Sequence, residues 1–322
     1  MRKSISTLIS VVIIGLLLFI LEHLEPPANT FLWRELFNIG HVPLFGVLSL
    51  LFLNLSINIL GRFLSPYYWH YLVALAVATA TGVASEFIQI FGSRDADIGD
   101  LVRDLVGAIV FLGLTATFDL KIKTPLKTNI TRHIPAFRIF LLLLFISTFV
   151  PVFLWFGAYW HRDRIFPTLF NFDSSWQKAF IQTHHARLSF VPPPPEWPET
   201  SKGKIARITY IPATWPDLEM NEPYPDWSGY DSLVFSILST VDTIARMSIR
   251  IEDIHHNHRF EDRYTLSFYL EKGLNRISLP LSDVASAPAS RKMDMTAIHA
   301  MHLYVYKIPD SLTFYIDKFI LK

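Results

Sequence analysis

The sequence predicts two domains of different class: an all-α transmembrane bundle of about five helices over residues 1–160, and an all-β antiparallel jelly-roll sandwich over residues 161–322. Long runs of Leu, Ile, Val, Phe and Ala fill the chain before about Trp160, whereas charged residues, prolines and short alternating segments follow it. Apolar residues make up 51% of the chain and charged residues only 18%. This balance is more apolar than that of an ordinary soluble protein.

Five segments have about the 17 to 25 apolar residues needed to cross ~30 Å of hydrocarbon. The first follows the basic start MRKS and could be mistaken for a signal peptide. No small-x-small cleavage pattern follows it, because the chain continues as EHLEPPANT, so we expect an uncleaved helix. The segments are Thr7–Leu24, Gly40–Leu60, Tyr71–Phe91, Leu101–Leu120 and Phe137–Trp160.

The distribution of Lys and Arg predicts the orientation. Arg2, Lys3 and Arg62 lie on the side of the membrane that also receives the basic loop between the fourth and fifth segments. The opposite loops, 25–39 and 92–99, carry fewer basic residues. The positive-inside rule therefore places the N-terminus in the cytoplasm and the C-terminal domain outside it, in a multi-pass protein of the cell (inner) membrane.

Charge and cysteine content exclude several classes of protein. A net charge of +1 without a long basic run argues against nucleic acid as a partner. The chain has no cysteine, which excludes a disulfide framework, a thiol nucleophile and a zinc–thiolate site. We expect membrane lipids as partners, no cofactor and no metal.

Polar residues interrupt the apolar pattern in ASEFIQIFGSRDADIGDLVRDLVGA, residues 84–108. Ionisable groups in hydrocarbon are costly and by default indicate function. The predicted topology brings these residues to the outer ends of their helices, together with the histidine that opens the second segment. The candidate site residues are His41, Glu86, Gln89, Arg94, Asp100 and Asp104.

Helical spacing refines this set. Asp97, Asp100 and Asp104 follow one another at intervals of three and four and share one stripe, with Arg94 or Arg103 as the cationic partner. A structural interpretation remains open: Asp97 and Asp100 suit the capped, positive end of a helix. Asp104, like Glu86, has no capping role, and its structural alternative is a buried ion pair that fixes helix packing.

The pieces GHVPLFG, EFIQIFGSR and DLVRDLVG resemble the VanZ-like membrane domain over residues 36–120. The resemblance implies a location in the cell envelope and an association with glycopeptide-antibiotic resistance, but no established reaction. Asp104 departs from the family, which usually has Asn there, and Phe37 and Asn38 replace a frequent Asp-Lys pair. The family positions that the chain keeps are His41, Glu86, Gln89, Arg94, Asp100 and Gly107.

The C-terminal half shows period-two alternation bounded by Gly, Pro, Asn and Asp, without a convincing helix. The run PPPPEWP, within 191–198, predicts an extended connector. Seven or eight short strands of this kind favour an antiparallel sandwich. The predicted inward sets are Leu233, Phe235 and Ile237; Met247, Ile249 and Ile251; Leu266, Phe268 and Leu270; Ile277, Leu279 and Leu281; Leu303 and Val305; and Phe314 and Ile316.

The segments DWSGYDSLVFSI, LEKGLNRISLPL and FYIDKFIL resemble the galactose-binding-like jelly roll of carbohydrate-binding modules. Alternation predicts an outward face with aromatic and charged side chains, which suits sugar stacking and hydrogen bonding. An ordinary strand face remains the alternative. The candidate ligand-binding residues are Arg250, Tyr269, Tyr304 and Tyr306, whereas the histidines of IHHNHRFED are expected in a solvated loop.

Two functions follow as hypotheses. One is a VanZ-like envelope protein whose outer domain binds a glycan. The alternative is a membrane enzyme acting on a lipid-linked envelope substrate at the outer leaflet, with Glu86, Asp100 or Asp104 as acid or base and Arg94 on a phosphate. An ion-coupled carrier is disfavoured because the acidic residues lie at one membrane face. The sequence leaves open whether the protein is an enzyme.

Overall fold

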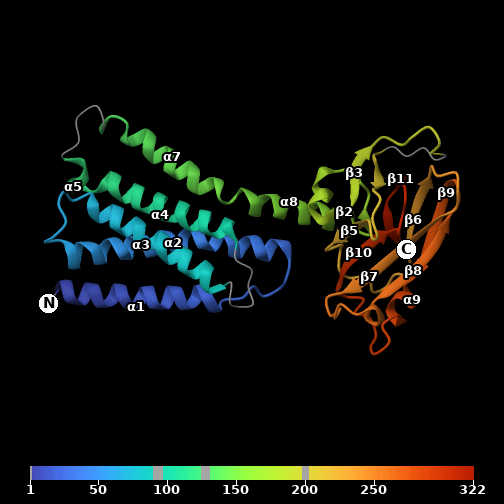
Figure 1. Ribbon diagram of the computed structural model, residues 1–322, viewed down its shortest axis with the longest axis horizontal. Helices are drawn as coiled ribbons and strands as arrows, with labels where there is room; N and C mark the ends of the chain where they lie inside the picture. The colour runs from blue at the N-terminus through green and yellow to red at the C-terminus, as the bar shows by residue number, and fades with distance from the viewer. Residues whose placement is uncertain (1, 90–96, 125–130, 198–202) are drawn as a thin grey trace. The chain divides into compact units, whose positions relative to one another are not determined.

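A computed structural model describes residues 2–89, 97–124, 131–197 and 203–322. The chain forms two compact units, Met1–Trp155 and Phe156–Lys322. The first is helical and the second is a β-sandwich (Figure 1).

The helical unit is organised around α2, which packs against α1, α3 and α4, while α4 also packs against α7 (Figure 1). The unit boundary falls inside α8. The helices are α1 (Arg2–His23), α2 (Phe31–Leu60), α3 (Trp69–Gln89), α4 (Ile98–Phe118), α5 (Leu120–Lys123), α7 (Ile134–Ser147) and α8 (Val150–Ile165).

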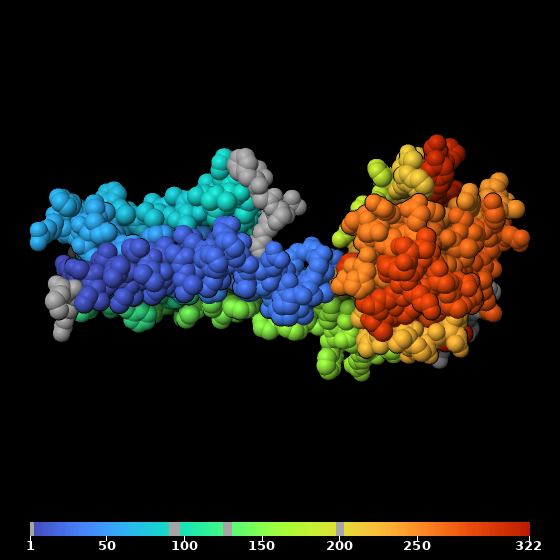
Figure 2. All heavy atoms as spheres, turned by 90° about the horizontal axis from the view of Figure 1, so that it is seen from below, coloured from blue at the N-terminus to red at the C-terminus, as the bar shows by residue number. Residues whose placement is uncertain are grey.

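Five helical stretches within the described residues are long and apolar enough to cross a membrane. Their outward side chains are apolar: Leu8 of α1 is 65% exposed and Leu143 of α7 is 60% exposed. Figure 2 shows α1, in dark blue, on the surface of its unit. Such a surface would be unstable in water and is typical of a lipid-facing bundle.

Two helix boundaries differ from the sequence expectation. α2 begins at Phe31 because Thr30 caps it by accepting a hydrogen bond from the Trp33 amide. His41 therefore lies inside α2 and does not open the helix. The fifth segment is divided into α7 and α8 after Ser147, where Pro151 occupies the first turn of the second piece, a position that tolerates its missing N–H.

The sandwich consists of two antiparallel sheets. Short helical turns connect the strands: η1 (Ser175–Phe180), η2 (Phe260–Asp262) and α9 (Leu281–Ser286). One sheet runs β1 (Thr168–Phe170), β12 (Phe319–Leu321), β6 (Ser232–Ser239), β11 (Leu312–Ile316), β4 (Ile205–Tyr210) and β3 (Ala186–Val191), with β9 (Gly273–Pro280) on β6. The other runs β2 (Ile181–His184), β5 (Asp217–Asn221), β10 (Ile298–Tyr304), β7 (Ala245–Asp253) and β8 (Tyr264–Leu270).

The first and last strands of the sandwich lie beside each other. β1 pairs with β12, which pairs in turn with the start of β6. Backbone bonds continue this closure, because the Lys322 carbonyl accepts from the amides of Asp231 and Ser232. Residues about 150 positions apart therefore complete one sheet.

The core lies between the sheets and follows the predicted alternation. Phe235 of β6 stacks on Phe319 of β12 at 4.6 Å, and the Tyr210 hydroxyl donates to the Leu303 carbonyl of the opposite sheet at 2.6 Å. Two members of the predicted inward sets behave differently. Leu266 on β8 is 38% exposed, and Leu281 is buried as the first residue of α9.

Candidate functional site

Polar side chains of α2 and α4 meet inside the helical unit. His41 Nδ1 lies 2.9 Å from Asp104 Oδ1, and His41 Nε2 lies 3.9 Å from Asp100 Oδ2. The Asp104 side chain is buried, at 2% exposure, and that of His41 is nearly so, at 14%. One imidazole thus bridges two carboxylates that stand one turn apart on α4.

Arg103 is the positively charged neighbour of Asp97 and Asp100. Its guanidinium pairs with Asp100 and lies 3.5 Å from Asp97. Asp97 also caps α4, because its carboxylate accepts from the Gly99 amide at 2.8 Å. Arg94, the other predicted cation, lies outside the described residues.

Glu86 joins the same region through the backbone. Its carboxylate accepts a hydrogen bond from the Asp97 amide at 2.9 Å, which ties the end of α3 to the start of α4. We call His41, Glu86, Asp97, Asp100, Arg103 and Asp104 the helix cluster.

The Gln89 side chain contacts Ser85 and not the helix cluster. Its amide contacts the Ser85 hydroxyl at 3.3 Å, and Ser85 donates to Glu22 of α1 at 2.6 Å. The sequence analysis did not predict Glu22, although a carboxylate at the end of an apolar segment is itself a signal.

Glycines allow the helices to approach at the helix cluster. A Cβ on Gly107 of α4 would overlap the backbone of Val42, the residue after His41. A Cβ on Gly82 of α3 would lie 2.8 Å from Asp104 Oδ2. The contact between His41 and Asp104 therefore depends on small residues beside it.

A second group of polar residues covers the outward face of the β2-β5-β10-β7-β8 sheet. Register puts His184, Asp217, Tyr304, Ser248 and Ser267 on one row across the strands. The neighbouring row contains Gln182, Glu219, His302, Arg250 and Thr265. The alternate residues of these strands face the core, so the two rows share the outward surface.

A cavity of about 430 Å³ opens over these rows, and we call it the sheet pocket. Its size lies within the ~300–1,000 Å³ usual for ligand sites. Loops add two aromatic rings and a guanidinium to the strand residues. The lining is His184, Trp215, Asp217, Arg250, Phe260, Arg263, His302 and Tyr304.

Aromatic rings flank the pocket. Trp215, 56% exposed, lies 5.7 Å from Tyr304 and 4.4 Å from Tyr306 between ring centres. Of the predicted residues, Arg250 and Tyr304 line the pocket, and Tyr306 packs on its tryptophan. Tyr269 lies on the same face opposite Arg246, beyond the lining.

Hydrogen bonds join the histidines of the sheet pocket to carboxylates. His302 Nδ1 lies 2.7 Å from Asp217 Oδ2, and His184 Nε2 lies 3.0 Å from Glu219 Oε2. Asp217, Glu219 and His302 also offer ligand atoms within 4.8 Å of one another, a spacing that a metal ion could use. The two histidine–carboxylate hydrogen bonds use Asp217 Oδ2 and Glu219 Oε2, and Asp217 Oδ1 is buried without a hydrogen-bond partner among the described residues.

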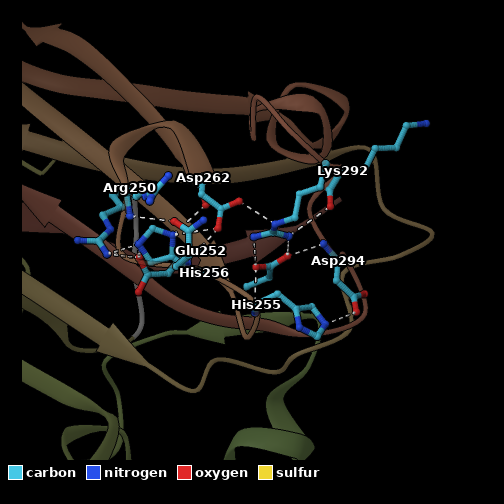
Figure 3. A network of polar contacts seen from close by, with 11 residues as sticks. Arg250, Glu252, His255, His256, Asp262, Lys292 and Asp294 are labelled. Atoms are coloured by element: carbon cyan, nitrogen blue, oxygen red, sulfur yellow. Dashed lines mark hydrogen bonds and ion pairs between the residues drawn. The ribbon is translucent and has the colours of Figure 1, made fainter.

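In the histidine-rich loop, His255 and His258 are exposed, as expected for a solvated loop, whereas the His256 side chain is buried. The His256 side chain is 3% exposed; its Nε2 accepts a hydrogen bond from Arg250 Nη2 at 3.2 Å, and its Nδ1 donates to the Asp262 carbonyl at 2.8 Å. Arg250 also pairs with Glu252. Figure 3 shows Arg250, Glu252, His256 and Asp262 side by side, with His255 turned toward Asp294.

Sequence reasoning missed several residues of the sheet pocket. Trp215 stands between two prolines in a loop before β5, and Phe260 and Arg263 belong to the η2 turn before β8. Alternation identifies residues on strands, but it has no information on which loop folds over a sheet. An exposed tryptophan in a proline-bounded loop was the available signal for Trp215.

Comparison with known proteins found likeness in structure alone. No protein-family model matches the sequence, and no curated protein matches it. A solved exo-β-agarase is similar with a TM-score of 0.40 and 18% identity, over 48% of this chain and 24% of that enzyme. The chain therefore matches only about a quarter of the agarase.

Carbohydrate-binding modules are matched over most of their own length. The family 11 module from Clostridium thermocellum, solved with a β-1,3-1,4-mixed-linked tetrasaccharide, has a TM-score of 0.37 and 18% identity over 48% of this chain and 93% of the module. A family 30 module of a cellulosomal cellulase from Clostridium thermocellum has a TM-score of 0.32 and 10% identity over 48% of this chain and 95% of the module.

Proposed function

We propose that the protein is a multi-pass envelope membrane protein whose C-terminal domain binds a carbohydrate in the sheet pocket. The observation that carries the proposal is the combination of exposed aromatic rings with hydrogen-bonding groups at one cavity. Trp215 and Tyr304 offer ring faces on which a sugar can stack, while Asp217, His302 and Arg250 offer acceptors and donors to its hydroxyls.

The helical half serves in this proposal as the membrane anchor. The Lys and Arg distribution supports a cytoplasmic N-terminus and an extracytoplasmic sandwich. The role at the cell envelope is proposed from the sequence resemblance of residues 36–120 to the VanZ-like domain, which no protein-family model matches. The ligand is then an envelope glycan or a lipid-linked sugar.

Substitution of the aromatic rings tests carbohydrate binding. Full-length protein in nanodiscs would be titrated with bacterial envelope glycans, with isothermal titration calorimetry as the readout. We expect Trp215→Ala and Tyr304→Ala each to weaken binding about tenfold or more, since stacking rings carry much of such affinity. Ile244→Ala removes an exposed apolar side chain outside the pocket and serves as the control. Unchanged binding in both ring variants would exclude the sheet pocket.

The helix cluster favours a second candidate function, acid–base chemistry at the outer leaflet. His41 is oriented by Asp104 on one nitrogen and faces Asp100 with the other, an arrangement suited to proton transfer. Glu86→Gln and Asp104→Asn preserve side-chain shape while removing the carboxylate. Loss of turnover of a lipid-linked envelope precursor in both folded variants would support an enzyme, whereas full turnover in both would contradict it.

A further inference from the structure

We propose that the sheet pocket selects acidic sugars, with the anionic group bound by Arg263. This inference rests on the proposed carbohydrate binding and adds the charge class of the ligand.

Most charged groups around the pocket are paired. Asp217 is bonded to His302 and Glu219 to His184, as described above, and Arg250 forms an ion pair with Glu252. Arg263 differs from them: in the described part of the chain no carboxylate forms an ion pair with it. It is the unmatched cation of the lining.

The surroundings of Arg263 make an anion favourable there. Its Nε is buried without a hydrogen-bond partner among the described residues, and the same is true of Arg250 Nε. Burial and the nearby charge of Arg250 lower the pKa of Arg263, and they outweigh Tyr304, Glu252 and Glu261, which act in the opposite direction. Two guanidinium groups facing one cavity repel each other, and a bound anion relieves that repulsion.

Arg263 is also held in position to receive such a group. Its guanidinium lies 5.2 Å from the centre of the Phe260 ring, in the same pocket wall. A planar guanidinium fixed by an aromatic ring presents paired N–H donors, which match the oxygens of a carboxylate or a sulfate. A sugar ring stacked on Trp215 and Tyr304 would share the cavity with this group.

Pairs of glycans that differ only in their charged group separate the contribution of the charge to binding from that of the sugar. Full-length protein in nanodiscs would be titrated with uronate-containing oligosaccharides and their carboxyl-reduced counterparts, and with sulfated oligosaccharides and their desulfated counterparts. We expect at least one acidic member to bind about tenfold or more tightly than its neutral counterpart, the range for a charge-assisted hydrogen bond. The uronate and sulfate pairs identify which anion is preferred.

Variants test whether Arg263 is responsible. Arg263→Gln should reduce the ratio of the affinities for the acidic and the neutral member to about twofold or less. Arg263→Lys should retain part of the preference, because it keeps the charge without the planar donors. Lys272→Gln removes an exposed positive charge outside the pocket and should leave the preference intact.

The outcomes distinguish this inference from the proposed function. Equal binding of acidic and neutral members, both dependent on Trp215, would overturn the inference and leave carbohydrate binding standing. A preference that survives Arg263→Gln would also overturn it. Absence of binding to every glycan, acidic or neutral, by folded protein would reject the proposed function and the inference together.

Discussion

Asp253 at the end of β7 has a fully buried carboxylate, and its stabilisation depends on one arginine. Arg291 donates to its two oxygens at 2.5 and 2.7 Å and also to Asp262 at 2.7 Å. The Asp294 amide donates to the same carboxylate at 2.6 Å. This network joins β7 to the η2 turn that carries Phe260, and Figure 3 shows its Asp262 and Asp294 members. The network thus holds in place the turn that carries Phe260, a lining residue of the sheet pocket.

Removal of the buried charge tests this support. We expect Asp253→Ala to destabilise the sandwich by about 3 kcal/mol, because Arg291 loses one of its two carboxylate partners and the Asp294 amide loses its acceptor. Thermal unfolding of the full chain in detergent, followed by tryptophan fluorescence, measures the loss. Asp242→Ala removes a carboxylate that is 84% exposed and paired with Lys272, and it should change stability little. Equal effects of the two variants would contradict a structural role for the network.

The same network predicts a loss of stability in acid. Burial raises the pKa of Asp253, but hydrogen bonds from Arg291 and the Asp294 amide outweigh it and hold the pKa below its usual value. Arg291 also lowers the pKa of Asp262. The unfolded state therefore takes up protons first, so the stabilisation is complete above about pH 4 and is lost as the pH falls through the lower folded values. Unfolding curves between about pH 5 and pH 2 should show a steep acid loss below about pH 4 that is reduced in Asp253→Ala.

At the scale of helices, Gly107 sets the distance between α2 and α4. Any larger side chain there meets the Val42 backbone, which cannot move as a flexible side chain can. His41 and Asp104 of the helix cluster lie on these same two helices, so packing and polar geometry are coupled. One methyl group added at Gly107 should therefore also displace His41.

Replacement of this glycine has a matched control on the partner helix. We expect Gly107→Ala to cost about 1–3 kcal/mol through overpacking and to displace His41 from Asp104. Gly40→Ala adds the same methyl group to α2, where nothing lies within 4 Å, and should be neutral or slightly stabilising. Thermal unfolding of both variants in detergent gives the comparison. Equal stability of the two would contradict close packing at Gly107.

How far the sequence predicted these elements depends on how local each signal is. The transmembrane segments and inward strand sets follow from hydropathy and alternation, which act over a few residues, and the structure bears out the predicted fold class. The meeting of His41, Asp100 and Asp104 was also within reach, because the predicted topology brings all three toward the same membrane face and Asp100 and Asp104 share one helical stripe. Contacts such as Glu22 with Ser85, or Arg263 over the sheet, depend on tertiary packing that no local pattern contains.

For the whole molecule, orientation in the membrane is the central prediction. The chain has no cysteine, so single-cysteine variants report location without background. We expect a membrane-impermeant maleimide to label an Asp310→Cys variant in spheroplasts and an Arg62→Cys variant only after permeabilisation, as the positive-inside rule requires. Both positions are exposed within their own units. The reverse labelling pattern would invert the topology and put the sheet pocket in the cytoplasm.

The pairing of β1 with β12 determines when, during synthesis of the chain, this sheet can be completed. The seam between Thr168–Phe170 and Phe319–Leu321 cannot form until the residues near 320 have been synthesised and delivered. Pairing across so long a separation is entropically costly and slow. If the sandwich lies outside the cytoplasm, its strands must cross the membrane unpaired and pair afterwards. Until the last strand arrives, the chain exposes unpaired strand edges that are prone to aggregate, and it depends on chaperones on that side of the membrane.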